Sequence, residues 1–193
     1  MPVAKYNNIF SVTLLNSISP LSNSLKTFLS QRMISTHYKK GDYIVKRGEV
    51  CDRIHAIRKG LIRGYFDYND NEITTWVSVD NEIVTSISGY FKKEPASENI
   101  QCLEETYTES LGFDDMDYAI KNYPDMAELN RILMVHYYIH AENRAFLARI
   151  SGAKERYEHF TKTFNPEIVK RLPKKYMASL LNIRPETLSR LYQ

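Results

Sequence analysis

The chain has 193 residues, of which 43% are hydrophobic, 12% aromatic and 25% charged, and its formal net charge is +3. This composition is typical of a globular protein with a substantial core and excludes a wholly disordered or fibrous chain. No apolar stretch approaches the ~18 to 20 residues that span a bilayer, and the segment from Met1 to Asn8 has no signal-peptide core. We therefore expect a cytoplasmic protein with no membrane partner.

The first 32 residues have the pattern of a helical lead-in. Ser19 is the expected N-cap and Pro20 the first helical residue, because proline is favoured at that position. Apolar side chains then recur at helical spacing, which predicts a face that packs against the rest of the protein: Leu21, Leu25, Phe28 and Leu29.

Between residues 33 and 113 the pattern changes to short β-branched and aromatic runs. Glycines punctuate these runs, and the segment 69–71, Asn-Asp-Asn, is typical of a hairpin turn. Many short strands at regular intervals predict a double-sheet β-roll of the jelly-roll kind. The expected strands are 43–45, 53–57, 61–68, 73–79 and 106–111. Cys51 and Cys102 fall within this region and are too few for a disulfide scaffold, so we expect reduced packing residues.

A long helix is predicted from about 125 to 150, and it carries two apolar stripes. One stripe follows the 3,4 spacing of a coiled-coil seam and contains a polar residue of the kind that fixes a dimer's register: Leu129, Ile132, His136, Ile139, Asn143, Phe146 and Ile150. The other stripe could cover the roll: Met126, Leu129, Leu133, Tyr137, His140 and Leu147. A homodimer is the expected assembly; the alternative is a helix buried in the core of a monomer.

Enzyme signatures are missing from the sequence. His136 and His140 are four residues apart, a spacing that can chelate a metal, but no acidic residue follows His136 as in a metalloprotease. No serine occupies a nucleophile elbow, and no glycine-rich phosphate loop occurs. We therefore expect no catalysis and no metal or other cofactor. A cupin-like metal enzyme remains as a distant alternative.

The C-terminal end is basic and contains the clearest motif of the chain. From residue 151 onward nine Lys and Arg face four Glu, a net charge of +5, which leaves −2 for the first 150 residues. Residues 174–191 are typical of a helix, a tight turn and a second helix. Ala178 permits close crossing, Asn182 suits a left-handed turn, and Pro185 opens the second helix. Such a unit reads DNA with the outward residues of its second helix.

Two further stretches complete a resemblance to a known family. Residues 38–49, YKKGDYIVKRGE, and 54–63, IHAIRKGLIR, resemble the opening of a cyclic-nucleotide-binding β-roll. Together with the long helix and the motif ASLLNIRPETLSR at 178–190, they resemble the Crp/Fnr family of bacterial transcription regulators over roughly residues 30 to 193. The resemblance implies an effector-binding roll at 1–124, a dimerisation helix at 125–150 and a DNA-binding domain at 151–193. It also implies a palindromic double-stranded DNA operator and a contact with RNA polymerase.

The sequence departs from the cyclic-AMP-binding members of that family. Their Gly-Glu pair is here Asn81-Glu82, and the stretch 95–100 lacks the arginine that holds the cyclic phosphate, while Glu98 would repel one. Lys92 and Lys93 are the only substitute cations nearby. The cysteine cluster of the iron-sulfur oxygen sensors is absent as well. We expect an unidentified small-molecule effector and not cyclic AMP, in a pocket formed by Glu82, Ser97, Asn99, Trp76 and Tyr137.

The DNA-binding end also departs from many relatives. Where they place wing strands, residues 165–173 begin with a helix cap and predict a short helix. Phosphate contacts are then expected from Lys170, Arg171, Lys174 and Lys175. Pro185 stands where some relatives carry a base-reading arginine, so base readout is expected from Arg184, Glu186, Thr187, Ser189 and Arg190.

The predicted fold class is therefore α+β. It comprises an N-terminal jelly-roll-like β-roll, a long dimerisation helix and a C-terminal helix-turn-helix domain without an evident wing. The predicted function is a dimeric DNA-binding transcription regulator. The alternative is a ligand-sensing regulatory module that acts through protein contacts and keeps a vestigial helix-turn-helix.

Overall fold

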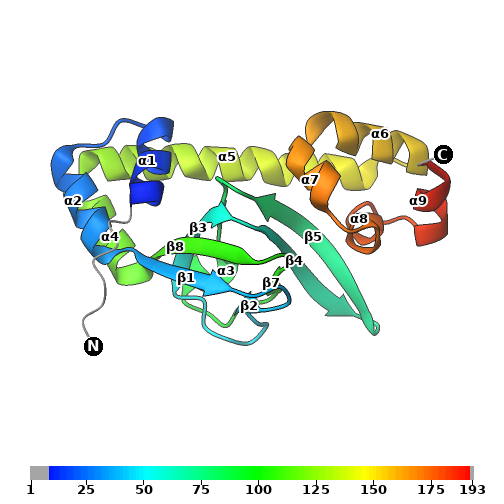
Figure 1. Ribbon diagram of the computed structural model, residues 1–193, viewed down its shortest axis with the longest axis horizontal. Coiled ribbons are helices and arrows are strands. Elements are labelled where there is room, and N and C mark those ends of the chain that lie inside the picture. Colours follow the sequence, from blue (N-terminus) through cyan, green and yellow to red (C-terminus); the bar gives the residue numbers. More distant parts are fainter. Residues whose placement is uncertain (1–8, 192–193) are drawn as a thin grey trace.

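The computed structural model describes residues 9–191 and has an α+β fold in which a long helix spans the molecule above a β-roll (Figure 1). The roll strands are β1 (Ile34–Tyr38), β2 (Tyr43–Val45), β3 (Arg53–Lys59), β4 (Leu61–Tyr68), β5 (Asn71–Val79), β6 (Ile83–Val84), β7 (Asn99–Cys102) and β8 (Thr106–Gly112). The helices are α1 (Ile9–Ile18), α2 (Asn23–Arg32), α3 (Ile87–Lys92), α4 (Phe113–Asn122), α5 (Pro124–Arg149), α6 (Ala153–Thr163), α7 (Pro166–Arg171), α8 (Lys174–Leu180) and α9 (Pro185–Leu191).

Two four-stranded sheets form the roll, in the orders β1-β8-β3-β6 and β2-β7-β4-β5, with every paired strand antiparallel. This confirms the predicted double-sheet roll. Strands β4 and β5 form the longest hairpin. Its turn residues Asn69 and Asp70 have φ of 48° and 60°, the left-handed pair that matches the twist of a two-residue hairpin turn. The hairpin turn predicted at 69–71 is therefore confirmed.

The lead-in consists of two helices, and its expected cap is wrong. Helix α2 begins at Asn23, and its N-cap is Ser22, whose hydroxyl accepts a hydrogen bond from the amide of Leu25. The amide of Ser22 in turn donates to the carboxylate of Asp125 at 2.7 Å. Ser19 and Pro20 lie in the connection before this cap, because the bond to Asp125 fixes the start of α2 three residues later than proline preference alone indicates.

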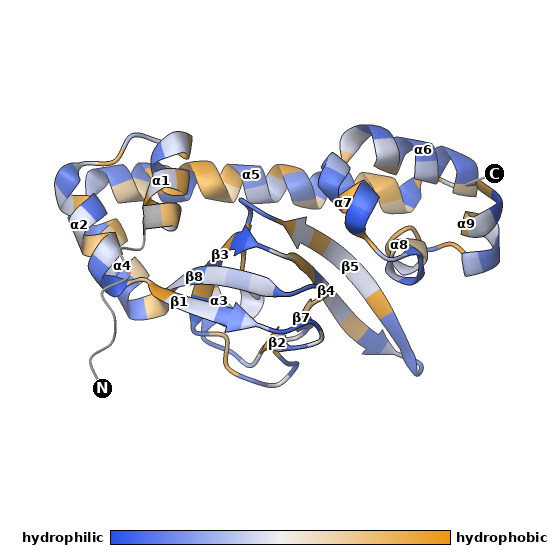
Figure 2. Cartoon of the chain, viewed as in Figure 1, coloured by the Kyte–Doolittle hydropathy of each residue, from blue (hydrophilic) through white to orange (hydrophobic). Residues whose placement is uncertain are grey.

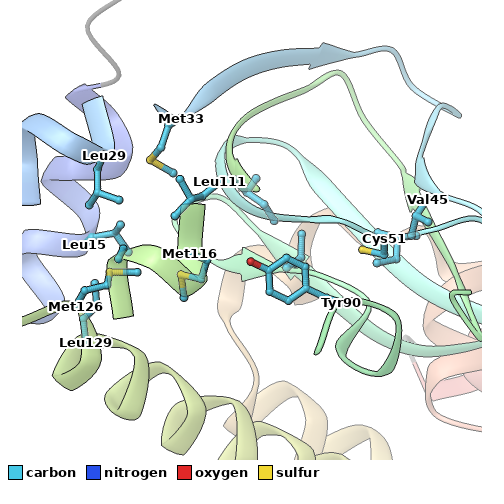
Figure 3. Close-up of a cluster of buried hydrophobic side chains, with 14 of the residues drawn as sticks. Leu15, Leu29, Met33, Val45, Cys51, Tyr90, Leu111, Met116, Met126 and Leu129 are labelled. Carbon is cyan, nitrogen blue, oxygen red and sulfur yellow. The ribbon is translucent and has the colours of Figure 1, made fainter. Parts of the chain in front are cut away.

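The main core lies between the lead-in, the inner faces of the roll and the start of α5. Leu25, Leu29 and Leu129 are fully buried there, and Figure 3 shows Leu29 and Leu129 converging with Met116 and Met126. Both cysteines are buried, and neither forms a disulfide. Burial raises the pKa of the Cys102 thiol to about 11, which keeps it protonated and confirms its interpretation as a reduced packing residue.

Helix α5 has 26 residues, or roughly 39 Å at 1.5 Å per residue. It spans Pro124–Arg149, which confirms the long helix that the sequence predicts at about 125 to 150. Its first residue is a proline, which is favoured at that position. It runs from the lead-in helices to the C-terminal helices (Figure 1). In the part of the chain that the structure describes, no helix is both long and apolar enough to cross a bilayer.

The imidazole of His55 is a buried titratable group in the roll. It lies 3.3 Å from the Thr108 hydroxyl, and burial, with a smaller effect of the Arg53 charge, lowers its pKa to about 4. The unfolded chain takes up a proton near pH 6.5, so the stability due to neutral His55 is present above that pH and is lost as the pH falls toward 4. We expect a loss of about 3 kcal/mol over this window.

Urea unfolding at intervals between pH 7.5 and 4 measures this effect. The variant His55→Gln should have a shallower pH dependence than the wild type over the same interval. Parallel curves for the two proteins would show that His55 is not the group responsible.

Candidate functional site

Helices α8 and α9 form the expected helix-turn-helix. Asn182 in the turn has φ of 49°, as the left-handed turn requires, and Ala178 is buried where the helices approach. The amide of Ile183 donates to the Ala178 carbonyl at 3.0 Å, which closes the turn. Pro185 begins α9, and Leu188 points into the core.

Arg156 of α6 holds this turn in place. Its Nη1 donates to the carbonyl of Asn182 at 2.9 Å and also to that of Leu181, while its Nε donates to the carbonyl of Ile150 at 3.0 Å. Arg156 is 9% exposed. One guanidinium therefore joins the end of α5 to the helix-turn-helix, so Arg156 is a structural residue and not one of the surface charges counted in the sequence.

The residues expected on DNA divide into three groups. Those with exposed side chains are Lys170, Lys174, Lys175, Arg184, Glu186, Ser189 and Arg190. Thr187 is half-buried. Among residues 9–191 the last strand is β8, so the segment between α5 and α8 holds helices and no wing strands, as the sequence predicts.

Arg171 forms the third group by itself, because carboxylates of the same chain occupy its guanidinium and its expected phosphate contact is not supported. Its Nη1 lies 2.6 Å from Asp80 and its Nη2 2.6 Å from Glu104, and the Glu167 carboxylate is 3.8 Å away. The side chain is only 17% exposed. These carboxylates, Glu104 first, raise its pKa and occupy its donors. Arg171 therefore ties the C-terminal helices to the roll.

Arg63 of β4 forms the second tie between the roll and the C-terminal helices, and the sequence gives little sign of it. The guanidinium is 1% exposed and lies between two aromatic rings, 4.0 Å from the ring centre of Tyr65 and 3.9 Å from that of Tyr176 in α8. It donates to Glu72 at 2.6 Å and to Gln101 at 2.7 Å. Its ring contact with Tyr176 is therefore made by a fully desolvated cation.

Backbone hydrogen bonds extend this contact along β5. The amide of Thr74 donates to the Ser179 hydroxyl at 2.9 Å, and that hydroxyl donates to the Glu72 carbonyl at 3.1 Å. Apolar side chains of the roll also join one buried cluster with those of the C-terminal helices, among them Leu61, Val79, Leu103, Phe160, Leu172 and Met177. We call the contacts of Arg63, Arg171 and Ser179 the docking contacts.

A cavity of about 210 Å³ lies between α5 and the roll. Three of the expected pocket residues line it: Trp76, Glu82 and Tyr137. Trp76 lies across Gly64, where any Cβ atom would collide with the indole ring. The other lining residues that bear charge or can bear it are His136, His140 and Arg144, all on α5.

The two remaining pocket residues lie elsewhere. Asn99 is buried in β7, where its side chain accepts from the Arg47 amide at 3.0 Å. Ser97 is exposed and its hydroxyl pairs with that of Ser88 at 3.3 Å. The side chain between them, Glu98, accepts from the Trp76 indole at 2.8 Å, so this loop reaches the cavity only by holding Trp76. Burial raises the pKa of Glu98.

Helix α5 has two faces, as its two stripes indicate. In the second stripe Met126, Leu129 and Leu147 are buried and Leu133 is half-buried, while Tyr137 and His140 line the cavity and are exposed. The expected seam is only partly free: Leu129 and Ile150 pack within the chain, Ile132 is half-buried and His136 lines the cavity, while Ile139, Asn143 and Phe146 are exposed. The exposed large apolar residues of α5 are Val135, Tyr137, Tyr138, Ile139 and Phe146, and the exposed part of the helix includes the expected seam positions His136, Ile139, Asn143 and Phe146.

Within residues 9–191 no group of three or more His, Cys, Asp or Glu side chains is placed to hold a metal ion. His136 and His140, which lie four residues apart on α5, therefore belong to no such group.

Comparison with known protein families identifies the roll. Residues 35–123, which cover the roll and α4, match the cyclic nucleotide-binding domain family. No curated protein matches the chain in sequence.

Solved structures share the fold over most of the chain. FixK2 from Bradyrhizobium japonicum has a TM-score of 0.70 at 16% identity, with 83% of this chain and 82% of that chain covered. A transcriptional regulator assigned to the Crp/Fnr family, from Eubacterium rectale, gives 0.68 at 17% identity, with 89% and 82% covered. The c-di-GMP-responsive regulator CLP from Xanthomonas campestris gives 0.69 at 10% identity, with 88% and 89% covered. The Crp/Fnr-like fold is thereby confirmed.

The docking contacts lead to a prediction about stability. Arg63→Met should lower the free energy of unfolding by about 2 to 3 kcal/mol, because it removes charged hydrogen bonds at a buried site. Tyr176→Leu should leave the roll intact and release α8. In both variants the backbone amides of α8 should exchange with solvent faster than in the wild type. Hydrogen-exchange mass spectrometry measures this rate.

The matched control is Arg58→Met, which removes an exposed arginine of β3, the strand that precedes β4 in the chain and belongs to the other sheet. It should leave exchange in α8 at the wild-type rate. Unchanged α8 exchange in Tyr176→Leu would mean that the ring contact does not hold the helix on the roll.

Proposed function

We propose that this protein is a cytoplasmic, homodimeric, DNA-binding transcription regulator of Crp/Fnr type, whose roll senses an unidentified small-molecule effector. The observation that carries the proposal is the recognition end of α9: Asn182 in the left-handed conformation sets the turn, and exposed Glu186, Ser189 and Arg190 follow on the outer side. The fold shared with regulators of this type supports it.

The surface of the DNA-binding end fits the same role. Exposed Lys170, Lys174 and Lys175 supply positive charge beside α9, and phosphate neutralisation provides most of the non-specific affinity for DNA. Base readout is assigned to α9 and to Arg184 at its start, because arginine can bridge guanine and a carboxylate can accept from cytosine.

Dimerisation is assigned to the exposed stripe of α5. Exposed apolar residues clustered on one face of a helix are typical of a contact surface. Val135, Ile139 and Phe146 follow the 3,4 spacing of a coiled-coil seam with Glu142 between the last two. Figure 2 shows α5 running free of other helices along its middle, where the partner's α5 would lie.

The proposal predicts distinct effects of two DNA-facing substitutions. A two-fold dimer should select palindromic DNA with half-sites about 34 Å, or roughly 10 base pairs, apart. Arg190→Ala should weaken binding by about 1 to 3 kcal/mol and relax preference at one base pair of each half-site. Lys175→Ala should weaken all sequences alike and lower the salt slope by about one unit. Selection from a random DNA pool, repeated with each variant, separates the two effects.

Two outcomes would count against these assignments. An enriched motif that is unchanged in Arg190→Ala would remove Arg190 from base readout. Failure to enrich any palindrome, with or without cell extract to supply an effector, would favour the alternative in which the helix-turn-helix is vestigial.

The dimer surface gives a separate prediction. Phe146→Asp should produce monomers at micromolar concentration, because a charge placed in the stripe would be buried unpaired between the two helices. Ser24→Asp adds the same charge at an exposed position of α2 and is the control. Sedimentation velocity measures the mass of each variant. A wild-type protein that sediments as a monomer would contradict the assignment.

A further inference from the structure

The cavity between α5 and the roll has a largely apolar wall, a row of basic side chains on α5 and a few polar side chains from the roll, Glu82 among them. Its apolar lining includes Ile54, Trp76, Ile83, Val84, Leu133 and Met134. On α5, His136, His140 and Arg144 follow at intervals of four residues, so they form one row along the face that lines the cavity. Pockets of this kind, apolar with a few convergent polar groups, are typical binding sites for small molecules.

The charge of Arg144 is available to a ligand. Arg144 forms none of the ion pairs found among residues 9–191. Its guanidinium carbon lies 5.7 Å from the ring centre of Tyr137, with which its side chain also hydrogen-bonds, so the remaining guanidinium donors are left for a ligand. The carboxylate of Glu98 interacts electrostatically with Arg144 and also accepts a hydrogen bond from the Trp76 indole at 2.8 Å, so it is held against the cavity wall. An arginine keeps its charge at any physiological pH. The site therefore favours an anion.

The volume of the cavity and the carboxylate of Glu82 in its lining narrow the class of anion. The volume of about 210 Å³ is below the range of roughly 300 to 1,000 Å³ that holds drug-sized ligands, so the ligand is smaller than a cyclic nucleotide. Glu82 lines the cavity, and its carboxylate accepts from Asn165 and from the amide of Val79. A second negative group on the ligand would be repelled by Glu82. A single acidic group with an apolar body satisfies both walls.

We propose that this cavity binds a small organic monocarboxylic acid. Its carboxylate lies at Arg144 and His140, and its apolar body packs against Trp76, Ile83 and Leu133. Arg144 forms the charge-assisted contact that orients the ligand. The proposal rests on the proposed function in one respect only: the bound acid would be the effector of that regulator.

The chain carries its own probe for this site. Trp76 is the only tryptophan in the sequence and lines the cavity, so intrinsic tryptophan fluorescence reports occupancy. We would titrate the full-length protein with benzoate and hexanoate, and with benzamide and hexanamide as neutral analogues of the same shape. At least one acid should change the emission saturably, and its amide should bind at least about tenfold more weakly. Cyclic AMP should cause no saturable change.

Two arginines of the same helix provide the matched comparison. Arg144→Gln should lower the affinity for the acid about tenfold, to that for the amide. Arg149→Gln removes an exposed arginine near the end of α5, outside the cavity lining, and should leave the affinity unchanged. His140→Gln is a second cavity variant, and circular dichroism confirms that each protein is folded. If Arg144→Gln fails to fold, the ratio of acid to amide affinity in the wild type tests the proposal instead: a ratio of about tenfold or more supports it, and equal affinities contradict it.

Several results would overturn the inference. These are equal affinities for acid and amide, unchanged acid affinity in Arg144→Gln, or no response to either acid at millimolar concentration. Tight binding of cyclic AMP would also overturn it, because the cavity would then admit a larger anion. DNA selection on the same preparations keeps the two proposals apart: DNA binding without any acid response defeats this inference alone, and an acid response without DNA binding defeats the proposed function alone.

Discussion

The guanidinium of Arg63 constrains how the two halves of the chain fit together. A guanidinium taken out of water must have its donors satisfied and its charge balanced, or the site loses several kcal/mol. Gln101 and Glu72 supply the acceptors, and Tyr65 covers one face. The other face is covered by Tyr176, which belongs to the first helix of the helix-turn-helix. The roll is therefore fully closed around its buried charge only when α8 is docked.

Strand β5 contacts both α8 and the cavity between α5 and the roll. Successive side chains of a strand point to opposite faces, and Figure 2 shows separate hydrophobic bands along β5. Trp76, Val77 and Ser78 line the cavity. Val77 and Val79 also join the buried cluster of the C-terminal helices, and the amide of Thr74 bonds Ser179. One strand therefore both lines the cavity and carries α8 of the helix-turn-helix.

The sequence predicts the elements of this fold better than the partners of its charges. Periodicity locates the strands, the long helix and the turn at Asn182, because each depends on local chemistry. Arg171 and Arg156 count as surface charge in the sequence, and only tertiary structure brings Asp80 to one and the Asn182 carbonyl to the other. Arg63 offers one signal, a lone charge within the apolar run of β4. On α5, spacing alone does not show where the rest of the chain covers the helix: both ends of the expected seam, Leu129 and Ile150, pack within the chain, while its middle positions are exposed.

The turn after β5 contacts both the cavity and the C-terminal helices. Asn81 and Glu82 line the cavity, while Asp80 bonds Arg171 and Glu82 accepts from Asn165, the N-cap of α7. A ligand that moves this turn changes the contacts that hold the DNA-binding unit on the roll, through atoms shared by both sites and without a long relay. Thermodynamic linkage then requires reciprocity: by whatever factor the ligand changes the affinity for DNA, DNA changes the affinity for the ligand. The fluorescence of Trp76, on the same strand, would register both sides of that exchange.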